Sequence, residues 1–310
     1  MVPVSKSRSR GEHFCVSHRR MTARYLDAHN HFWNYSPEDY PWINEGSPLH
    51  RNWLPQDLEA VQTPLGFSGS IAVQARQTLA ESRWLLELAH RHPRITGVVG
   101  WVDLRSPEVE QDLAALAADQ VFVGVRHVVQ DEEDDRFLLG ADFVRGLRLL
   151  SQHELRYDLL IYPKQLPAAV ELVESLPQQS FVLDHCAKPP IASGALEPWA
   201  EWLTRLAASP NVFCKVSGLV TEAAWQTWTL EQLRPYLDVV EAAFGRERLM
   251  WGSDWPVCLY ASAYKRWVEV CQQWVFGWSA AERDGFFGAN TARFYGVASA
   301  AESSAGSSSA

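Results

Sequence analysis

Two histidines near the start of the chain and one aspartate near its end have the residue types of a metal or acid–base site. His29 and His31 close an apolar run in the stretch LDAHNHFW, and Asp254 closes another in LMWGSDWP. Successive side chains of a strand point to opposite faces, so His29 and His31 should project together from one strand end. Paired imidazoles of this kind are ligands for divalent metal ions. Asp254 can meet them only if the chain closes into a ring.

The elements that would position these residues predict such a ring. Apolar, β-branched runs recur at a spacing of roughly 32 residues, which is the size of a strand-plus-helix unit. The eight runs lie at 25–31, 67–76, 95–103, 121–127, 157–162, 181–185, 212–217 and 249–254. Helix-like stretches lie between them at 79–92, 166–176 and 199–208. This alternation predicts an α/β fold with parallel strands, a single (β/α)8 barrel whose site lies at the C-terminal strand ends. A doubly wound open sheet is the main alternative.

Seven stretches of the chain resemble, in order, motifs of one enzyme superfamily. They read LDAHNHFW, AVQARQTLAESRWLL, GVVGWVDLRSP, GVRHVVQDE, FVLDHCAKP, VFCKVSGL and LMWGSDWPV. The chain resembles the amidohydrolase superfamily, specifically the amidohydrolase 2 group that contains metal-optional sugar lactonases acting on L-fuconolactone and L-rhamnonolactone. The resemblance covers about residues 24–297. It implies a (β/α)8 hydrolase that opens a sugar-derived aldonolactone in sugar catabolism.

The resemblance also implies a ligand set for one divalent ion. His29 and His31 would bind it with His185, in LDHCAKP, and with Asp254, in GSDWP. Three imidazoles and a carboxylate suit zinc best. The bridging lysine or glutamate of strand four and the histidine of strand five found in binuclear members are missing here, and some relatives work without metal. A single ion or a metal-independent site is therefore expected.

Asp254 and His185 are the predicted catalytic residues. Asp254 would act as general base, taking a proton from the attacking water and passing it to the departing ring oxygen. A neighbouring histidine or metal would keep Asp254 ionised. His185 would bind metal, orient the water or donate to the carbonyl oxygen. The adjacent Asp184 should face the other way and have a structural role.

Cations at the strand ends are candidates for holding the substrate carbonyl and hydroxyls. Arg76 ends the second strand run, and Lys215 lies on the seventh. Of Arg126 and His127 on the fourth, only one can point inward, and the sequence leaves open which one does. Such groups could stabilise the oxyanion of a tetrahedral intermediate. The alternative for each is a salt bridge to a loop acid such as Asp103 or Glu132.

Four further side chains are candidates for contacts with a sugar. Trp33 and Trp101 stand at or just past strand ends, where an indole could stack on the C–H face of a sugar ring, and Trp255 follows Asp254. Asp103, two residues after Trp101, could accept hydrogen bonds from hydroxyl groups. The remaining tryptophans of the 14 in the chain are expected in packing roles.

Composition limits the partners and the domain organisation. A net charge of −9 disfavours nucleic acid, and no apolar run of about 18 residues predicts a membrane span. The cysteines are five, scattered and without a C-x-x-C pair, which is typical of a reduced, cytoplasmic protein. We expect an extension at residues 1–23, one barrel at 24–297 and an Ala/Ser-rich disordered tail at 298–310. The partner is a small-molecule lactone, and monomer and homo-oligomer both remain open.

Three other functions stay open at this stage. A decarboxylase of the same superfamily branch would also use one metal ion, and a pocket with several cations suits a carboxylate. A lactonase acting on a muconolactone or an aromatic-derived lactone is a related reading. A non-catalytic binder of sugar acids is a third. The chain has no G-x-S-x-G elbow, Walker loop or dinucleotide-binding glycine motif, so serine-triad, nucleotide and hydride-transfer chemistry lose their usual support.

Overall fold

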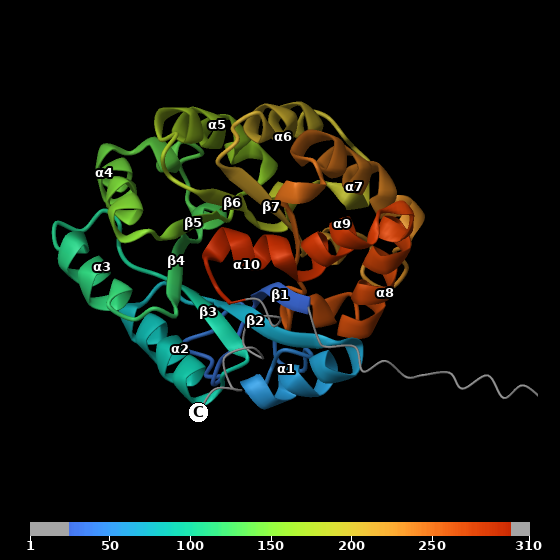
Figure 1. The fold of residues 1–310 in the computed structure, drawn as a ribbon, viewed down its shortest axis with the longest axis horizontal. Helices are drawn as coiled ribbons and strands as arrows, with labels where there is room; N and C mark the ends of the chain where they lie inside the picture. The colour runs from blue at the N-terminus through green and yellow to red at the C-terminus, as the bar shows by residue number, and fades with distance from the viewer. Residues whose placement is uncertain (1–24, 299–310) are drawn as a thin grey trace, which may run out of the picture.

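A computed structural model of the chain describes residues 25–298 (Figure 1). The extension expected at 1–23, and all but the first residue of the tail expected at 298–310, lie outside these residues. Within them an eight-stranded parallel sheet runs in the order β1 to β8, each strand pairing with the next in sequence. The strands are β1 Tyr25–Asn30, β2 Phe67–Val73, β3 Ile95–Gly100, β4 Phe122–His127, β5 Arg156–Leu159, β6 Phe181–Leu183, β7 Val212–Val216 and β8 Leu249–Trp251.

Helices follow the strands and surround the sheet (Figure 1). They are α1 Pro55–Gln62, α2 Leu79–Arg91, α3 Val109–Ala117, α4 Ala141–Leu150, α5 Leu166–Ser175, α6 Trp199–Ala207, α7 Leu230–Phe244, α8 Tyr264–Trp274, α9 Ala280–Asp284 and α10 Asn290–Tyr295. Local signals set several starts: Thr78 accepts from the backbone N–H of Glu81 before α2, and Pro167 occupies the first turn of α5. The (β/α)8 barrel prediction is confirmed, and the open-sheet alternative is not.

The ring closes between β1 and the segment after β8. His31 N–H donates to Trp255 O at 2.7 Å, and Asp254 N–H donates to His29 O at 2.9 Å. The two stretches that lie more than 220 residues apart in sequence are therefore hydrogen-bonded neighbours, as the pairing of His29 with Asp254 requires. The strands themselves end earlier than the apolar runs, because the last residues of several runs turn out of the sheet to form the loops around the site.

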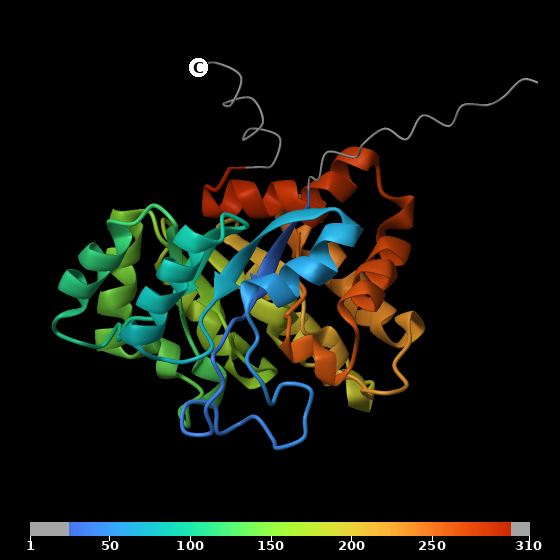
Figure 2. The same ribbon diagram turned by 90° about the horizontal axis from the view of Figure 1, so that it is seen from below.

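The two ends of the barrel have different roles. At one end α10 lies across the barrel, and at the other the long loop between β1 and α1 projects away from it (Figure 2). Phe294 and Tyr295 of α10 pack against the inward-facing Ala28, Val182 and Met250. Apolar packing therefore fills the α10 end, and the polar residues lie toward the opposite end.

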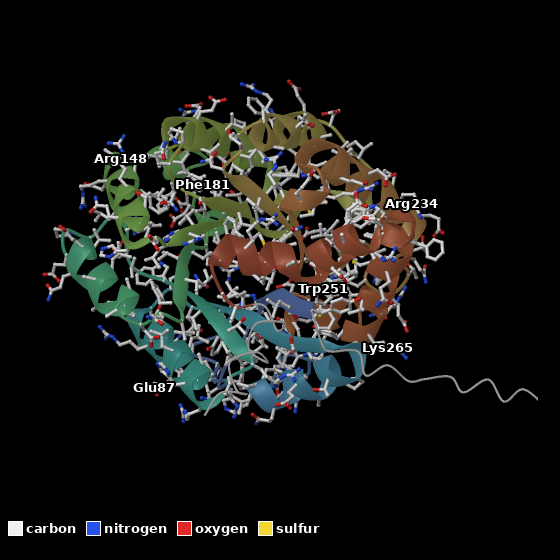
Figure 3. All side chains as sticks on the ribbon, in the orientation of Figure 1. Glu87, Arg148, Phe181, Arg234, Trp251 and Lys265 are labelled. Carbon is white, nitrogen blue, oxygen red and sulfur yellow. The ribbon has the colours of Figure 1, made fainter. Side chains whose placement is uncertain are left out.

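Most large apolar side chains lie in the interior and most charged side chains lie on the outside (Figure 3). Phe181 and Trp251 are fully buried between strands and helices, whereas Glu87, Arg148 and Lys265 lie on the periphery. Within residues 25–298, no helix is both long enough and apolar enough to cross a membrane.

Candidate active site

A cavity of about 470 Å³ opens at the C-terminal ends of the strands. It is lined by side chains from the ends of β1, β2, β4, β5, β6 and β8. They are His31, Trp33, Trp42, Ala75, Gln77, Arg126, Val128, Gln130, Asp131, Leu160, His185, Lys188, Asp254 and Val257. Its position is where barrel enzymes keep their active sites.

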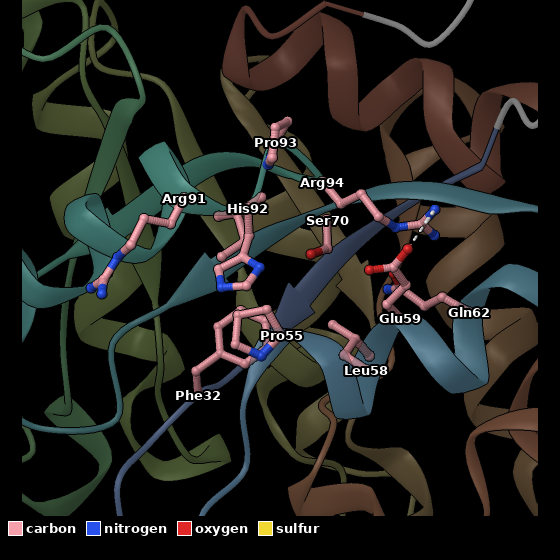
Figure 4. A pocket seen from close by; sticks show the side chains of 11 residues that line it. Phe32, Pro55, Leu58, Glu59, Gln62, Ser70, Arg91, His92, Pro93 and Arg94 are labelled. Carbon is pink, nitrogen blue, oxygen red and sulfur yellow. Dashed lines mark ion pairs between the residues drawn. The ribbon is translucent and has the colours of Figure 1, made fainter.

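A second hollow of about 320 Å³ lies between α1 and α2 on the outer side of β2 (Figure 4). It contains His92 and a loose Glu59–Arg94 ion pair, with 4.0 Å between Oε1 and Nη1. None of the predicted site residues lines it, so the cavity at the strand ends is the candidate site.

The four predicted metal-binding side chains converge at the base of this cavity. His29 Nε2 lies 3.2 Å from His31 Nε2 and 3.8 Å from Asp254 Oδ1. Asp254 Oδ1 is also 3.4 Å from His31 Nε2 and 3.9 Å from His185 Nε2. All four side chains are nearly or fully buried. The structure therefore brings together residues from β1, β6 and β8 as one cluster.

These separations fit a single divalent ion. A tetrahedral zinc ion with ligands at about 2.0–2.1 Å has ligand atoms about 3.3–3.4 Å apart, close to the 3.2–3.9 Å seen here. Ligand atoms of His29, His185 and Asp254 lie within 4.8 Å of one another, the one such group among residues 25–298; His31 contacts His29 and Asp254 but does not belong to this group. Three imidazoles and one carboxylate are also the right donor types for zinc.

Burial and neighbouring charge set the protonation of the cluster. Burial lowers the pKa of His185 to about 4 against the opposing effect of Asp254, and it lowers the pKa of His29 well below the ordinary value although Asp184 opposes it. Burial alone would raise the pKa of Asp254, but His185 and the hydrogen bond from His31 outweigh it and lower that pKa. At neutral pH the site combines neutral His29 and His185 with an ionised Asp254.

His185 reaches the cavity through an unusual backbone conformation. After β6 ends at Leu183, His185 has φ 52° and ψ 30°, in the left-handed region that side chains rarely adopt. Its Nδ1 then lies 2.8 Å from Ser217 Oγ. Gly218 makes room for this ring, because a Cβ there would stand 2.7 Å from His185 Cγ.

Asp184 does not face away from the interior as expected. It continues the inward alternation of β6, while the left-handed turn at His185 brings the next side chain inward as well. Its carboxylate lies 3.1 Å from Arg126 Nη1 and 3.1 Å from Lys215 Nζ. Strand alternation fails here because the strand has already ended.

On β4, Arg126 points into the barrel and His127 points away from it. Arg126 lines the cavity, with Nη1 3.3 Å from His29 Nε2 and Nη2 3.2 Å from Gln74 Oε1. His127 turns outward, where Nε2 donates to Glu132 Oε1 at 2.6 Å and Nδ1 accepts from Trp101 Nε1 at 3.2 Å. His127 is therefore engaged by the loop acid Glu132 through a hydrogen bond, and Arg126 is the cation that lines the cavity.

Lys215 lies beneath the cavity instead of lining it. The side chain is fully buried, and Nζ lies 2.5 Å from Asp158 Oδ2 and 3.1 Å from Asp184 Oδ1. Tyr295 OH donates to Asp158 as well. We call Arg126, Asp158, Asp184 and Lys215 the charged belt. It contains two cations and two carboxylates, which satisfies the requirement that buried charges be paired.

The structure separates the other predicted substrate contacts. Trp33 lines the cavity, and its Nε1 donates to Arg51 O at 2.9 Å. Arg76 does not line it, because Nη2 pairs with Asp39 Oδ1 at 2.5 Å. Asp103 is turned to Arg105 and is 41% exposed.

Two more aromatic candidates are absent from the cavity lining. Trp101 is engaged by its hydrogen bond to His127 and is absent from the lining, and Trp255 is buried edge-on against Trp53.

Several lining residues escaped the sequence reasoning. Lys188 stands three residues after His185, its Nζ 5.2 Å from the centre of the Tyr162 ring. Trp42, in the β1–α1 loop, lines the cavity with a side chain that is 45% exposed. Lys188 occurs in FVLDHCAKP, a stretch that carried the family resemblance. Neither residue lies in a strand, so alternation could not select them. Gln130 Oε1 is buried at the cavity and has no hydrogen-bond partner within residues 25–298.

Known proteins are similar to this chain in sequence. The amidohydrolase family model matches residues 26–297. The chain is 41% identical over 289 residues to an L-fucono-1,5-lactonase of Burkholderia multivorans, covering 89% of this chain and 97% of the relative. An L-fucono-1,5-lactonase of Burkholderia ambifaria is 39% identical over 284 residues, with the same coverage.

A solved structure shares the fold. An amidohydrolase from Burkholderia multivorans, with bound zinc, superposes with a TM-score of 0.84 at 41% identity, covering 89% of this chain and all of that one. The motifs, the barrel and the matched length agree, and this chain belongs to the amidohydrolase family.

Proposed function

We propose that this protein is a lactonase, a carboxylic ester hydrolase that opens the ring of a sugar-derived aldonolactone of the L-fucono-1,5-lactone type. The observation that carries the proposal is an ionised, buried Asp254 facing three imidazoles in a cavity of substrate size. The relatives named L-fucono-1,5-lactonase, matched over nearly their whole length, support the substrate class.

Asp254 is the general base of the proposed reaction. It takes a proton from a water molecule whose oxygen bonds to the lactone carbonyl carbon. The resulting tetrahedral intermediate collapses by breaking the bond between that carbon and the ring oxygen. The proton on Asp254 then moves to the departing ring oxygen, which becomes a hydroxyl of the open sugar acid. No covalent intermediate with the protein is required.

Arg126 and Lys188 are the proposed cations for the carbonyl oxygen. Both line the cavity that contains Asp254. As negative charge develops on the oxygen, fixed positive groups stabilise it most where water is excluded. His185 complements them, because its neutral imidazole is held by Ser217 and can orient the attacking water.

One zinc ion is the proposed cofactor. His29, His31, His185 and Asp254 would hold it, as their atom types and separations allow. When bound, the ion supplies a Lewis acid that polarises the carbonyl oxygen or acidifies water. Without it, the same side chains position water and substrate, so metal-independent turnover is the alternative.

The walls suggest how sugar hydroxyls are recognised. Gln130 lines the cavity, its Oε1 has no hydrogen-bond partner among residues 25–298, and this amide would accept a hydrogen bond from a hydroxyl group. Trp33 and Trp42 offer apolar faces for the C–H side of a sugar ring. A small-molecule partner follows from this lining. A cytoplasmic location remains a prediction from the cysteine pattern, and the oligomeric state stays open.

The test is a pH-indicator hydrolysis assay on the purified full chain. The panel contains the 1,4- and 1,5-lactones of the L-fucono, L-rhamnono and D-galactono series, with chelator-treated and zinc-loaded protein side by side. We expect turnover in one stereochemical series. No hydrolysis of any lactone in the panel, by either the chelator-treated or the zinc-loaded protein, would overturn the proposal. Release of carbon dioxide from aromatic or dicarboxylic acids would favour the decarboxylase alternative.

A further inference from the structure

The joint between β1 and β8 differs from the other strand joints of the barrel. Each of the pairs from β1–β2 to β7–β8 forms a parallel ladder. Between β8 and β1, the described part of the chain shows one isolated bridge, which pairs Asn30 with Trp255. His29, His31 and Asp254 lie at this joint and would move apart if it opened. The joint therefore needs further contacts to keep the site assembled.

Asp27 of β1 supplies such a contact. Its carboxylate is fully buried, and Oδ1 accepts from two backbone N–H groups, that of His29 at 3.1 Å and that of Ser253 at 2.9 Å. His29 belongs to β1, and Ser253 belongs to the segment after β8. One oxygen atom thus connects two stretches of chain that a backbone ladder would connect elsewhere in the barrel.

The other oxygen of Asp27 is held by the surrounding helices. Oδ2 accepts from Tyr264 OH of α8 at 3.1 Å and from Gln62 Nε2 of α1 at 3.4 Å. These contacts fix the plane of the carboxylate and leave Oδ1 directed at the joint. The two oxygens therefore have separate tasks, because Oδ1 connects the strands and Oδ2 anchors the side chain.

Ser253 passes this constraint on to Asp254. Asp254 has φ 56°, in the left-handed region, which a non-glycine residue keeps only where neighbouring contacts hold the backbone. The Ser253 N–H donates to Asp27, and the Ser253 hydroxyl donates to His29 O at 3.2 Å. The same hydroxyl accepts from Trp255 N–H at 2.9 Å. The residue before the proposed base is therefore held through both its main chain and its side chain.

We infer that Asp27 is a positioning residue, whose Oδ1 joins β1 to the segment after β8 and so fixes Asp254 against the histidines. The inference rests on the proposed function, because the position of Asp254 matters for the proposed hydrolysis. Asp27 is absent from the cavity lining and acts through Ser253. Both donors at Oδ1 are neutral N–H groups, so an amide oxygen in the same place should serve as well as a carboxylate oxygen.

The first experiment measures amide hydrogen exchange in the wild-type, full-length protein by nuclear magnetic resonance. The Ser253 N–H donates to Asp27 Oδ1 and belongs to no strand ladder. If Asp27 holds the joint, this N–H should exchange as slowly as the ladder N–H groups of β7 and β8. Exchange as fast as that of exposed loop amides would overturn the inference, and this outcome depends on no variant being folded.

The second experiment compares three substitutions. Asp27→Ala removes both oxygens. Asp27→Asn keeps one acceptor oxygen for the joint, and its NH₂ group can donate to the Tyr264 hydroxyl in place of Oδ2. Tyr264→Phe is the matched control, because it removes a buried hydrogen bond to Oδ2 and leaves both contacts of Oδ1 in place. The measurements are amide exchange, urea unfolding, and kcat and KM on the lactone that the wild type hydrolyses.

Asp27→Ala should accelerate exchange of the Ser253 and Asp254 N–H groups by about tenfold relative to the amides of β4 and β5. Its kcat should fall by about 10²-fold, because a displacement of about 1 Å at the reacting groups has this effect. Its KM should change less than kcat, since Asp27 does not line the cavity. Asp27→Asn should recover most of the kcat and the slow Ser253 exchange. Tyr264→Phe should lose stability but keep both.

Two results would overturn the inference. One is a folded Asp27→Ala protein whose kcat and Ser253 exchange match those of Tyr264→Phe. The other is an Asp27→Asn protein whose kcat falls by about 10²-fold although its amide keeps the acceptor oxygen. If Asp27→Ala does not fold, Asp27→Asn and the wild-type exchange still decide. If the wild type hydrolyses no lactone, the proposed function fails, while the exchange rates still test whether Asp27 holds the joint.

Discussion

His185 and Asp254, at the ends of β6 and β8, share a left-handed backbone conformation, with φ values of 52° and 56°. Their side chains face each other, with His185 Nε2 3.9 Å from Asp254 Oδ1. Non-glycine residues rarely adopt this region, and such conformations gather at functional sites, where the surrounding structure holds them. Here the turn directs both side chains into the cavity at the point where each strand has ended. The geometry of the cluster therefore depends on the loops as much as on the strands.

Gly218 should be required for the position of His185. Alanine at this residue, with φ +64°, costs about 1–2 kcal/mol of backbone energy, and its Cβ would also stand 2.7 Å from the His185 ring. Gly194→Ala is the matched control, because its φ is +74° and nothing lies within 4 Å of the added Cβ. We expect Gly218→Ala to lose at least as much stability as Gly194→Ala and only Gly218→Ala to lose activity, as measured by urea unfolding and lactone hydrolysis. Equal activity in the two would contradict the steric argument.

Asp254→Asn should abolish most turnover without unfolding the protein. An amide cannot accept the proton of the attacking water, so kcat should fall by about 10²–10⁴-fold. Asp142→Asn, at a side chain that is 76% exposed, controls for the loss of one carboxylate. Stopped-flow hydrolysis and near-ultraviolet circular dichroism on both variants make the comparison. A folded Asp254→Asn protein with full activity would exclude Asp254 as the base.

Lys188 should matter more for turnover than its moderate burial suggests. Replacement by methionine removes one of the two cations lining the cavity, and we expect kcat/KM to fall by about 10²–10³-fold. Lys164→Met is the control, since this lysine pairs with Asp135 at the surface, where both side chains are about half exposed. Steady-state kinetics on the two variants measure the effect. Equal kcat/KM values for Lys188→Met and Lys164→Met would show that Lys188 does not act on the carbonyl oxygen.

Lys215 should contribute to stability first. Lys215→Met leaves Asp158 and Asp184 buried with one fewer cation, and breaking a buried pair in this way costs about 3–5 kcal/mol. Arg76→Met removes a part-exposed pair with Asp39 and should cost no more than about 1 kcal/mol. Urea unfolding of both variants measures the difference. If both variants lost only about 1 kcal/mol of unfolding free energy, Lys215 would not be held by buried ion pairs as the structure shows.

Glu81 should make the stability of the protein depend on pH. Burial raises the pKa of Glu81 to about 7, although its carboxylate accepts from the backbone N–H groups of Arg76 and Ala75. The folded state therefore binds more protons than the unfolded chain between pH 4.5 and 7, and the free energy of unfolding falls as pH rises through this window.

The measurement compares wild type with Glu81→Gln by urea unfolding at pH 5 and pH 7.5. Because glutamine does not titrate, the free energy of unfolding of the wild type should fall by about 2 kcal/mol more than that of the variant between pH 5 and pH 7.5. Parallel pH profiles would mean that Glu81 is ionised in the folded protein at both pH values.

Much of this site could be predicted from the chain alone, for identifiable reasons. His29 and His31 are two apart at a strand end, and the repeating strand–helix spacing fixes a barrel, so a ring that brings Asp254 to them follows from local pattern. These inferences need only the period of a strand and the order of the elements. They hold because each is encoded over a short stretch.

The tertiary structure decided what happens beyond the strand ends and along long side chains. Alternation could not choose between Arg126 and His127. It failed for Asp184 and His185, because Asp184 continues the inward alternation of β6 and the left-handed turn at His185 brings the next side chain inward as well. A strand position also does not say how deep a side chain ends. Lys215 lies below the cavity because buried Asp158 and Asp184 hold its ammonium there. Both outcomes depend on partners from distant strands, and those partners meet only when the barrel closes.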